Sequence, residues 1–152
     1  MKIALGSDHG GFALKEKIKA YLIEKGYEIE DFGTYSTESV DYPAFALKAA
    51  LAVSKGECEK GIVICSTGIG ISIAANKVKG VRAALCGDLL SARLTREHND
   101  TNILALGAFI VAEKLAYAIV DTWLGTEFSK EERHQRRIDR ITEIENKYLN
   151  NF

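Results

Sequence analysis

A regular alternation of short apolar runs with helix-forming segments is the feature that most constrains how this chain can fold. The run 61–65 is apolar at every position, which is typical of a strand buried on both faces of a sheet. The segments between the runs carry apolar residues at helical spacing, so parallel strands joined by helices are expected. The predicted strands are 2–7, 27–32, 61–65, 81–86 and 103–106. We therefore expect an α/β fold, a single Rossmann-like doubly wound domain over 1–152 with a five-stranded parallel sheet.

The segment from residue 129 onward differs from the rest because it is long and polar. Ser129 is followed three residues later by Glu132, the spacing of a capping box, which predicts a helix that begins at Ser129. Such a polar helix has little apolar surface with which to pack wholly on its own domain. We expect a C-terminal helical arm over 129–152.

Charge and hydropathy exclude several classes of function. The 152 residues include 20 Lys and Arg against 21 Asp and Glu, so no overall field favours nucleic acid or an anionic membrane. No apolar run approaches the length of a membrane span, and Asp8 comes too early for a signal peptide. A cytoplasmic protein that acts on small molecules is expected.

The three cysteines favour neither a disulfide framework nor a structural zinc site. Cys58, Cys65 and Cys86 are an odd number, with no Cys-x-x-Cys pair and no histidine at zinc-ligand spacing. Cys58 and Cys86 are interpreted as small buried residues of a reducing compartment. We expect no metal site.

Polar clusters lie beside three of the predicted strands. The segment 7–11 follows the first strand, 65–72 follows the third, and 97–100 comes just before the fifth. Because ligands of such folds bind at the carboxyl ends of the strands, we expect all three clusters to meet at this edge of the sheet. His9 and His98 fall in these clusters and are therefore functional candidates, whereas His134 does not.

Cys65 carries the chemical argument. A thiol between a buried strand and a helix N-terminus sits where unpaired amides favour an anion. Gly68 and Gly70 would let backbone N–H groups approach a charged oxygen of an enediolate. A non-enzymatic nucleotide-binding α/β module is a weaker alternative, because the dinucleotide pattern Gly-x-Gly-x-x-Gly would need a glycine at position 73, which is Ile73. A redox enzyme that uses Cys65 with Cys86 is a further alternative.

The terminal segment also holds two pairs of arginines at helical spacing. Arg133 and Arg137 are four residues apart, as are Arg136 and Arg140, so each pair shares a helix face and could grip a phosphate. From spacing alone, a solvated basic face balanced by neighbouring acidic residues is the favoured interpretation.

Five separated motifs in order strengthen the functional interpretation. They are Gly6-Ser7-Asp8-His9-Gly10-Gly11-Phe12, Asp41-Tyr42-Pro43, the segment from Cys65 to Asn76, His98-Asn99, and Arg133-His134-Gln135-x-Arg137. Together they resemble ribose-5-phosphate isomerase type B over nearly the whole chain. The superfamily also includes isomerases of allose 6-phosphate and galactose 6-phosphate, so the sugar stays open.

The resemblance implies an aldose–ketose isomerase of the pentose phosphate pathway that uses neither metal nor organic cofactor. Cys65 would move the substrate proton through a cis-enediolate, and Thr67 would hold the enediolate oxygens. Asp8 and His98 would open the sugar ring, while His9, Arg133 and Arg137 would bind phosphate. The remaining residues that it assigns to the substrate are Tyr42, Ser66, Gly68, Ile69, Gly70, Ile71, Ser72 and Asn99.

The resemblance further implies a homodimer, sometimes paired into a tetramer, with each active site built from two chains. His98, Asn99 and the terminal arginines would then reach the partner's copy of the Cys65 site. Two departures from the family pattern matter. Ser66 replaces a glycine that is common after the thiol, and Phe109 stands where relatives carry a phosphate-contacting arginine. The sugar is therefore ribose 5-phosphate or a six-carbon sugar phosphate, and Arg136 is a further candidate cation.

Overall fold

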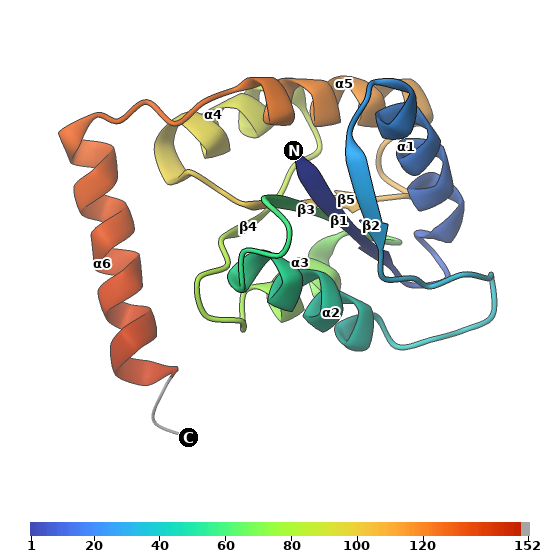
Figure 1. Ribbon diagram of the computed structural model, residues 1–152, viewed down its shortest axis with the longest axis horizontal. Helices are drawn as coiled ribbons and strands as arrows, with labels where there is room; N and C mark the ends of the chain where they lie inside the picture. Colours follow the sequence, from blue (N-terminus) through green and yellow to red (C-terminus); the bar gives the residue numbers. More distant parts are fainter. Residues whose placement is uncertain (150–152) are drawn as a thin grey trace.

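A five-stranded parallel sheet forms the centre of the protein in the computed structural model, which describes residues 1–149 (Figure 1). The strands are β1 (Lys2–Ser7), β2 (Glu28–Asp31), β3 (Lys60–Cys65), β4 (Ala83–Leu85) and β5 (Ile103–Gly107). Their order is β2-β1-β3-β5-β4, and every neighbouring pair is parallel. The expected α/β fold with five parallel strands is confirmed.

Helices cover both faces of this sheet. The helices α1 (Phe12–Glu24), α4 (Leu89–Asn99) and α5 (Glu113–Gly125) lie on one face, and α2 (Tyr42–Ser54) and α3 (Ile69–Ala75) lie on the other (Figure 1). Each face has its own apolar cluster. Because both faces are covered, the central strands are buried, as their continuous apolar sequence predicts.

Alternation along β3 decides which face carries Cys65. Ile62 and Ile64 pack with α1 and α5, whereas Val63 and Cys65 belong to the cluster under α2 and α3. The second cluster is rich in alanine, and small side chains let α2 and α3 lie close to the sheet. Cys65 therefore sits at the end of a fully buried strand, next to the turn into α3.

Several predicted boundaries need correction. The fourth strand is shorter than 81–86, and α5 begins at Glu113 instead of near residue 111. The predicted capping box is wrong, because the last helix, α6 (Glu132–Tyr148), has Glu131 at its N-cap. Lys130 has a positive φ of 59°, which breaks the helical path between Ser129 and Glu131.

The helix α6 stands beside the sheet domain and packs chiefly against its α4 side (Figure 1). His134 and Ile138 are its buried residues, while Ile141 and Ile144 remain exposed above a cleft of about 500 Å³. The amide of Gly80 donates to Glu145 Oε1 at 2.8 Å and ties the helix to the body. Residues 150–152 of the predicted arm lie outside the described residues. Among residues 1–149, no helix is long and apolar enough to cross a membrane.

Candidate active site

The Cys65 thiol is held by the first turn of its own loop. Cys65 is 5% exposed, and the amide of Gly68 donates to its Sγ at 3.1 Å. This contact fixes the position of the sulfur at the start of the turn into α3. The loop thus holds the candidate base, Cys65, and one backbone donor in direct contact with its sulfur.

The turn from Cys65 into α3 depends on glycine. Gly68 has a φ of +76°, and a side chain there would meet the backbone of Leu106. Thr67 Oγ1 accepts from the amide of Ile69 at 3.3 Å, and the amide of Ser72 donates to the Gly68 carbonyl. Within residues 1–149, the Gly70 and Ile71 amides of the first helical turn make no hydrogen bond to the protein. These two amides are available to an anionic oxygen.

Two close approaches bring neighbouring segments onto the loop. The ring of Tyr42, at the start of α2, lies so close to Gly70 that a side chain at position 70 would meet it. Gly10 lies in the same way against Ser66 Oγ. The loops after β1 and β3 are therefore in direct contact, as expected for neighbouring strands that end at one edge.

Asp8 and His9 complete this edge of the sheet. Asp8 is buried, and its Oδ1 accepts from the amide of Gly11 at 3.0 Å. His9 Nδ1 accepts from the amide of Val40 at 3.1 Å. We call this group the carboxyl-edge cluster; it consists of Asp8, His9, Tyr42, Cys65, Ser66, Thr67, Gly68, Ile69, Gly70, Ile71 and Ser72.

His98 and Asn99 lie elsewhere, so the prediction that all three polar segments meet at one edge is wrong for a single chain. They end α4, which runs antiparallel to the strands and leads directly into the start of β5. A segment that precedes a strand lies at the amino edge of the sheet. Figure 1 accordingly shows the end of α4 beside α6, on the side away from the β1–α1 loop.

The His98 ring instead lies against the His134 ring, with ring centroids 4.2 Å apart and the two planes tilted by 35°. His134 is 3% exposed, and its Nδ1 forms a hydrogen bond with Ser129 Oγ at 2.7 Å. Burial lowers the pKa of His134, and the neighbouring His98 and Arg133 add to this shift. Burial, together with these neighbours, therefore favours a neutral His134.

The terminal arginines lie on the exposed side of α6. Arg133 pairs with Glu131 at 2.8 Å and Arg136 with Glu132 at 3.0 Å, whereas no ion pair forms at Arg137 within residues 1–149. Arg133 and Arg137, which we expect to bind phosphate, therefore lie on the side of His98 and Asn99. They are not near the predicted site residues of the carboxyl-edge cluster. We call the group His98, Asn99, Arg133, His134 and Arg137 the amino-edge cluster.

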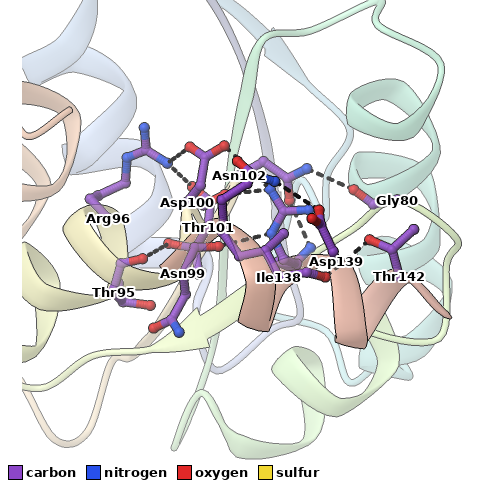
Figure 2. A network of polar contacts seen from close by, with 12 residues as sticks. Gly80, Thr95, Arg96, Asn99, Asp100, Thr101, Asn102, Ile138, Asp139 and Thr142 are labelled. Carbon is purple, nitrogen blue, oxygen red and sulfur yellow. Dashed lines mark hydrogen bonds and ion pairs between the residues drawn. The ribbon is translucent and has the colours of Figure 1, made fainter. Parts of the chain in front are cut away.

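A network of polar contacts fixes the end of α4 at this edge. Figure 2 shows the Arg96 guanidinium between the Asp100 carboxylate, at 2.8 Å, and the Thr101 carbonyl, at 2.6 Å. Asn102 Nδ2 donates to the carbonyl of Gly80 at 2.8 Å. Because Arg96 is buried, these bonds are not exchanged readily for water. The end of α4, which carries His98, is thus fixed by this network.

Phe109 occupies an exposed position at the carboxyl edge. Its side chain is 76% exposed, and its amide donates to the carbonyl of Ser66 at 2.9 Å. The backbone here touches the Cys65 loop, but the side chain supplies no charge. In the described part of the chain, no group of three or more metal-ligating side chains gathers at any place.

Two contributors to the carboxyl-edge cluster escaped the sequence analysis. Val40 acts through its amide, and nothing in the sequence of a loop marks one backbone donor among many. Lys15 is fully buried and binds Asp31 at 2.6 Å, at the end of β2. The burial of Lys15 could have been predicted from the sequence, because Lys15 shares the apolar face of α1 with Ile18 and Leu22.

Comparison with known proteins decides the family. The model of the family described as Ribose/Galactose Isomerase matches residues 3–141. The chain belongs to this family. The ribose-5-phosphate isomerase B of Escherichia coli is 54% identical over 95% of this chain and 96% of its own length.

Solved structures of this isomerase family agree with the fold throughout. The ribose-5-phosphate isomerase B of Clostridium thermocellum is 60% identical, with a TM-score of 0.96 over 97% of this chain and 99% of that one. That of Mycoplasma genitalium with bound ribulose-5-phosphate is 41% identical, with a TM-score of 0.91 over 95% of this chain and 96% of that one.

Membership of the family makes the chain an aldose–ketose isomerase and confirms the resemblance read from its motifs. The redox alternative also loses support from the molecule itself. Cys86 is 2% exposed, and burial raises its pKa, so it is poorly suited to attack an oxidised Cys65.

Proposed function

We propose that the protein interconverts ribose 5-phosphate and ribulose 5-phosphate, with Cys65 as the base. The Cys65 thiolate takes the proton from C2 of the open-chain aldose, which leaves a cis-enediolate over C1 and C2. The same thiol then returns the proton to C1, while a proton moves from O2 to O1, and the ketose results. A two-way proton transfer suits a side chain whose reacting atom is held in place by a nearby backbone donor.

The observation that carries this proposal is the hydrogen bond from the Gly68 amide to Cys65 Sγ, next to the free amides of Gly70 and Ile71. The sulfur and these donors lie in one short turn. A substrate whose C2 faces the sulfur would place its developing oxyanion near the amides, where fixed dipoles stabilise it without rearrangement.

The other carboxyl-edge residues take roles that follow from their contacts. Asp8 is buried and held by one amide, so its other carboxylate oxygen can exchange a proton with the sugar during ring opening. Thr67 and Ser66 supply hydroxyls to the enediolate and the sugar. Tyr42, on Gly70, borders the sugar, and His9 binds the phosphate.

We further propose that two copies of the chain build each site. The carboxyl-edge cluster holds the base but no arginine, while the amino-edge cluster holds Arg133, Arg137 and His98 but no base. A homodimer that brings one copy's amino-edge cluster to the other's carboxyl-edge cluster would complete both sites at once. His98 would then share ring opening with Asp8, and Asn99 would orient the sugar hydroxyls. Pairing of two such dimers into a tetramer belongs to the same proposal.

Phe109 supports a second candidate, a six-carbon sugar phosphate such as allose 6-phosphate or galactose 6-phosphate. An exposed phenyl ring on the loop that touches Ser66 offers apolar surface in place of a cation. A longer sugar would carry its phosphate past this position to the arginines of α6, so one missing cation would matter less.

A panel of substrates tests these proposals. Purified protein is given ribose 5-phosphate, allose 6-phosphate and galactose 6-phosphate, and the ketose formed is measured for each. We expect the largest kcat/KM for ribose 5-phosphate. A larger value for a hexose phosphate would favour the second candidate, and no turnover of any of them would contradict both.

The pathway, the compartment and the domain organisation of the enzyme are part of the same proposal. We infer a place in the pentose phosphate pathway, in the cytoplasm, with residues 1–152 acting as one domain. The three free thiols Cys58, Cys65 and Cys86 support a reducing compartment, because thiols seldom stay unpaired in an oxidising one.

A further inference from the structure

The loop between β2 and α2, residues 32–41, has neither helix nor strand, yet it reaches two parts of the carboxyl-edge cluster. Near its end, the amide of Val40 donates to His9 Nδ1 at 3.1 Å. Directly after it, Tyr42 lies on Gly70. The loop therefore connects the segment that follows β1 with the segment that follows β3.

The Val40 contact determines where the His9 proton is. A backbone N–H can only donate, so Nδ1 must accept and carries no proton. In a neutral imidazole the single proton is then on Nε2. The contact also fixes the ring orientation, because a half-turn of the ring would put a carbon atom in front of the Val40 amide.

We propose that the Val40 amide is a positioning group that holds His9 as the Nε2–H tautomer, so that the ring always presents a donor to an anionic oxygen of the substrate. The assignment of the tautomer depends only on the contact with Val40. The assignment of the bound anion as the substrate phosphate depends on the proposed function. A histidine held in this way binds an anion even when it is neutral.

The loop is anchored strongly enough to fix Val40. At its start, Asp31 accepts from the fully buried Lys15 Nζ at 2.6 Å and from the amide of Gly33 at 2.9 Å. The Tyr35 hydroxyl donates to the Asp31 carbonyl at 2.7 Å. At its other end the chain enters α2 at Tyr42. Both ends are therefore tied to rigid elements, and the span between them is short.

The tautomer is measured on the unmodified protein. Protein labelled with ¹⁵N at histidine is studied by long-range ¹H–¹⁵N NMR at a pH where the rings are neutral, and the signal of His9 is assigned with His9→Asn. We expect Nε2 to carry the proton. A His9 ring protonated on Nδ1 overturns the proposal.

Substitution at position 40 tests the consequence for binding. Val40→Pro removes the N–H, and the matched control Val40→Ala shortens the side chain but keeps it. We expect Val40→Pro to mix the His9 tautomers and to raise KM for ribose 5-phosphate about tenfold, as for one misdirected bond to a charged group, with kcat changed less than about twofold. Val40→Ala should resemble the wild type in both readouts.

The outcomes separate this inference from the proposed function. A folded Val40→Pro variant with unchanged KM overturns the positioning role. If far-UV circular dichroism shows that this variant does not fold, the wild-type tautomer alone decides the proposal. An Nε2–H ring in a protein that turns over no sugar phosphate upholds the positioning of His9 and contradicts the proposed function. An active isomerase with an Nδ1–H ring contradicts the positioning of His9 alone.

Discussion

At the carboxyl edge of the sheet, functional side chains are placed by backbone that continues directly from buried strands. At the amino edge, they are placed by contacts between two helices, of which α6 has only two buried residues. Cys65 ends a strand with no exposed residue, whereas His98 lies against the ring of His134 near the end of a helix that the Arg96 network fixes. The first cluster is thus part of the core, and the second is docked onto it.

Under the proposed function, this difference explains how the two clusters would divide the chemistry between them. Moving a proton to and from carbon needs a base placed to within a fraction of an ångström, and a strand end in a packed sheet gives that precision. Holding a phosphate tolerates more movement, because charge acts over a longer distance. In the proposed dimer, a docked arm that carries arginines would meet this weaker demand and could also join a second chain.

The largest effect that we expect is the loss of the base at the carboxyl edge. Cys65→Ala should lower kcat for ribose 5-phosphate by at least about a thousandfold, because proton transfer by a positioned base contributes that order of rate. The fold should survive, since alanine suits the alanine-rich cluster around it. Isomerase assays with circular dichroism check this, and Cys58→Ala, which lies just before the start of β3 and therefore at its opposite end, serves as the active control. Turnover near the wild-type rate in Cys65→Ala would sink the role of the thiol.

The division between the two edges can itself be broken and restored. Cys65→Ala and His98→Asn damage different edges, so a mixed dimer would keep one intact site. Refolding the two inactive variants together should recover about a quarter of the wild-type activity, as expected for random pairing in a two-fold dimer. Neither variant alone should show it.

The control for this mixing experiment pairs two changes at one edge. Cys65→Ala with Asp8→Asn leaves both sites of every dimer damaged, so no activity should return. Recovery in this control, or none in the first mixture, would contradict sites that are shared between an amino edge and a carboxyl edge.

At the carboxyl edge, two lysines bind the Asp31 carboxylate, and we expect the buried one to contribute more to stability than the partly exposed one. Lys15→Met should lower the free energy of unfolding by about 3 kcal/mol, because it leaves the Asp31 carboxylate largely buried with one partner fewer. Lys19→Met removes the partly exposed partner of the same carboxylate and should cost less than about 1 kcal/mol. Urea denaturation of both variants measures the two costs, and equal costs would show that burial of Lys15 has no special weight.

The sequence was sufficient for the fold and for the carboxyl edge because these follow from local pattern. An uninterrupted apolar run ending at Cys65, followed by glycines, predicts a buried strand and a tight turn into a helix. The error over His98 came from the direction of a helix: a residue just before a strand lies at the opposite edge from one just after it. The order of helix and strand along the sequence gives the direction of the helix, so the position of His98 could have been predicted.

Other features depend on tertiary contacts and could not be predicted. Ser129 and Glu132 have the spacing of a capping box, but the Ser129 hydroxyl binds the His134 ring and the Glu131 amide, and Lys130 turns the chain first. The contact between Val40 and His9 joins residues 31 positions apart through a loop without periodicity. Neither the Ser129 contacts nor the Val40–His9 contact can be recognised from the local sequence pattern.

The smallest expected effect concerns acid at the amino edge. Because burial and the facing His98 lower the pKa of His134 below its usual 6.5, the unfolded chain binds a proton here more readily than the folded chain. The contribution of His134 to stability is therefore complete above pH 6.5 and is lost as pH falls. The groups that face it are His98 on α4, Ser129 before α6, and Glu131, Arg133 and Arg137 around its own helix.

Urea denaturation at pH 7.5 and at pH 5.5 tests this on the wild type and on His134→Asn. We expect the wild type to lose more stability on acidification than the variant, and His98→Asn to lie between them because it removes one facing charge. Tryptic cleavage within 129–149 should also become faster at the lower pH in the wild type. If the two proteins respond to acid alike, His134 is not what couples the docking of α6 to protonation, and the amino edge would have to be held chiefly by the Arg96 network.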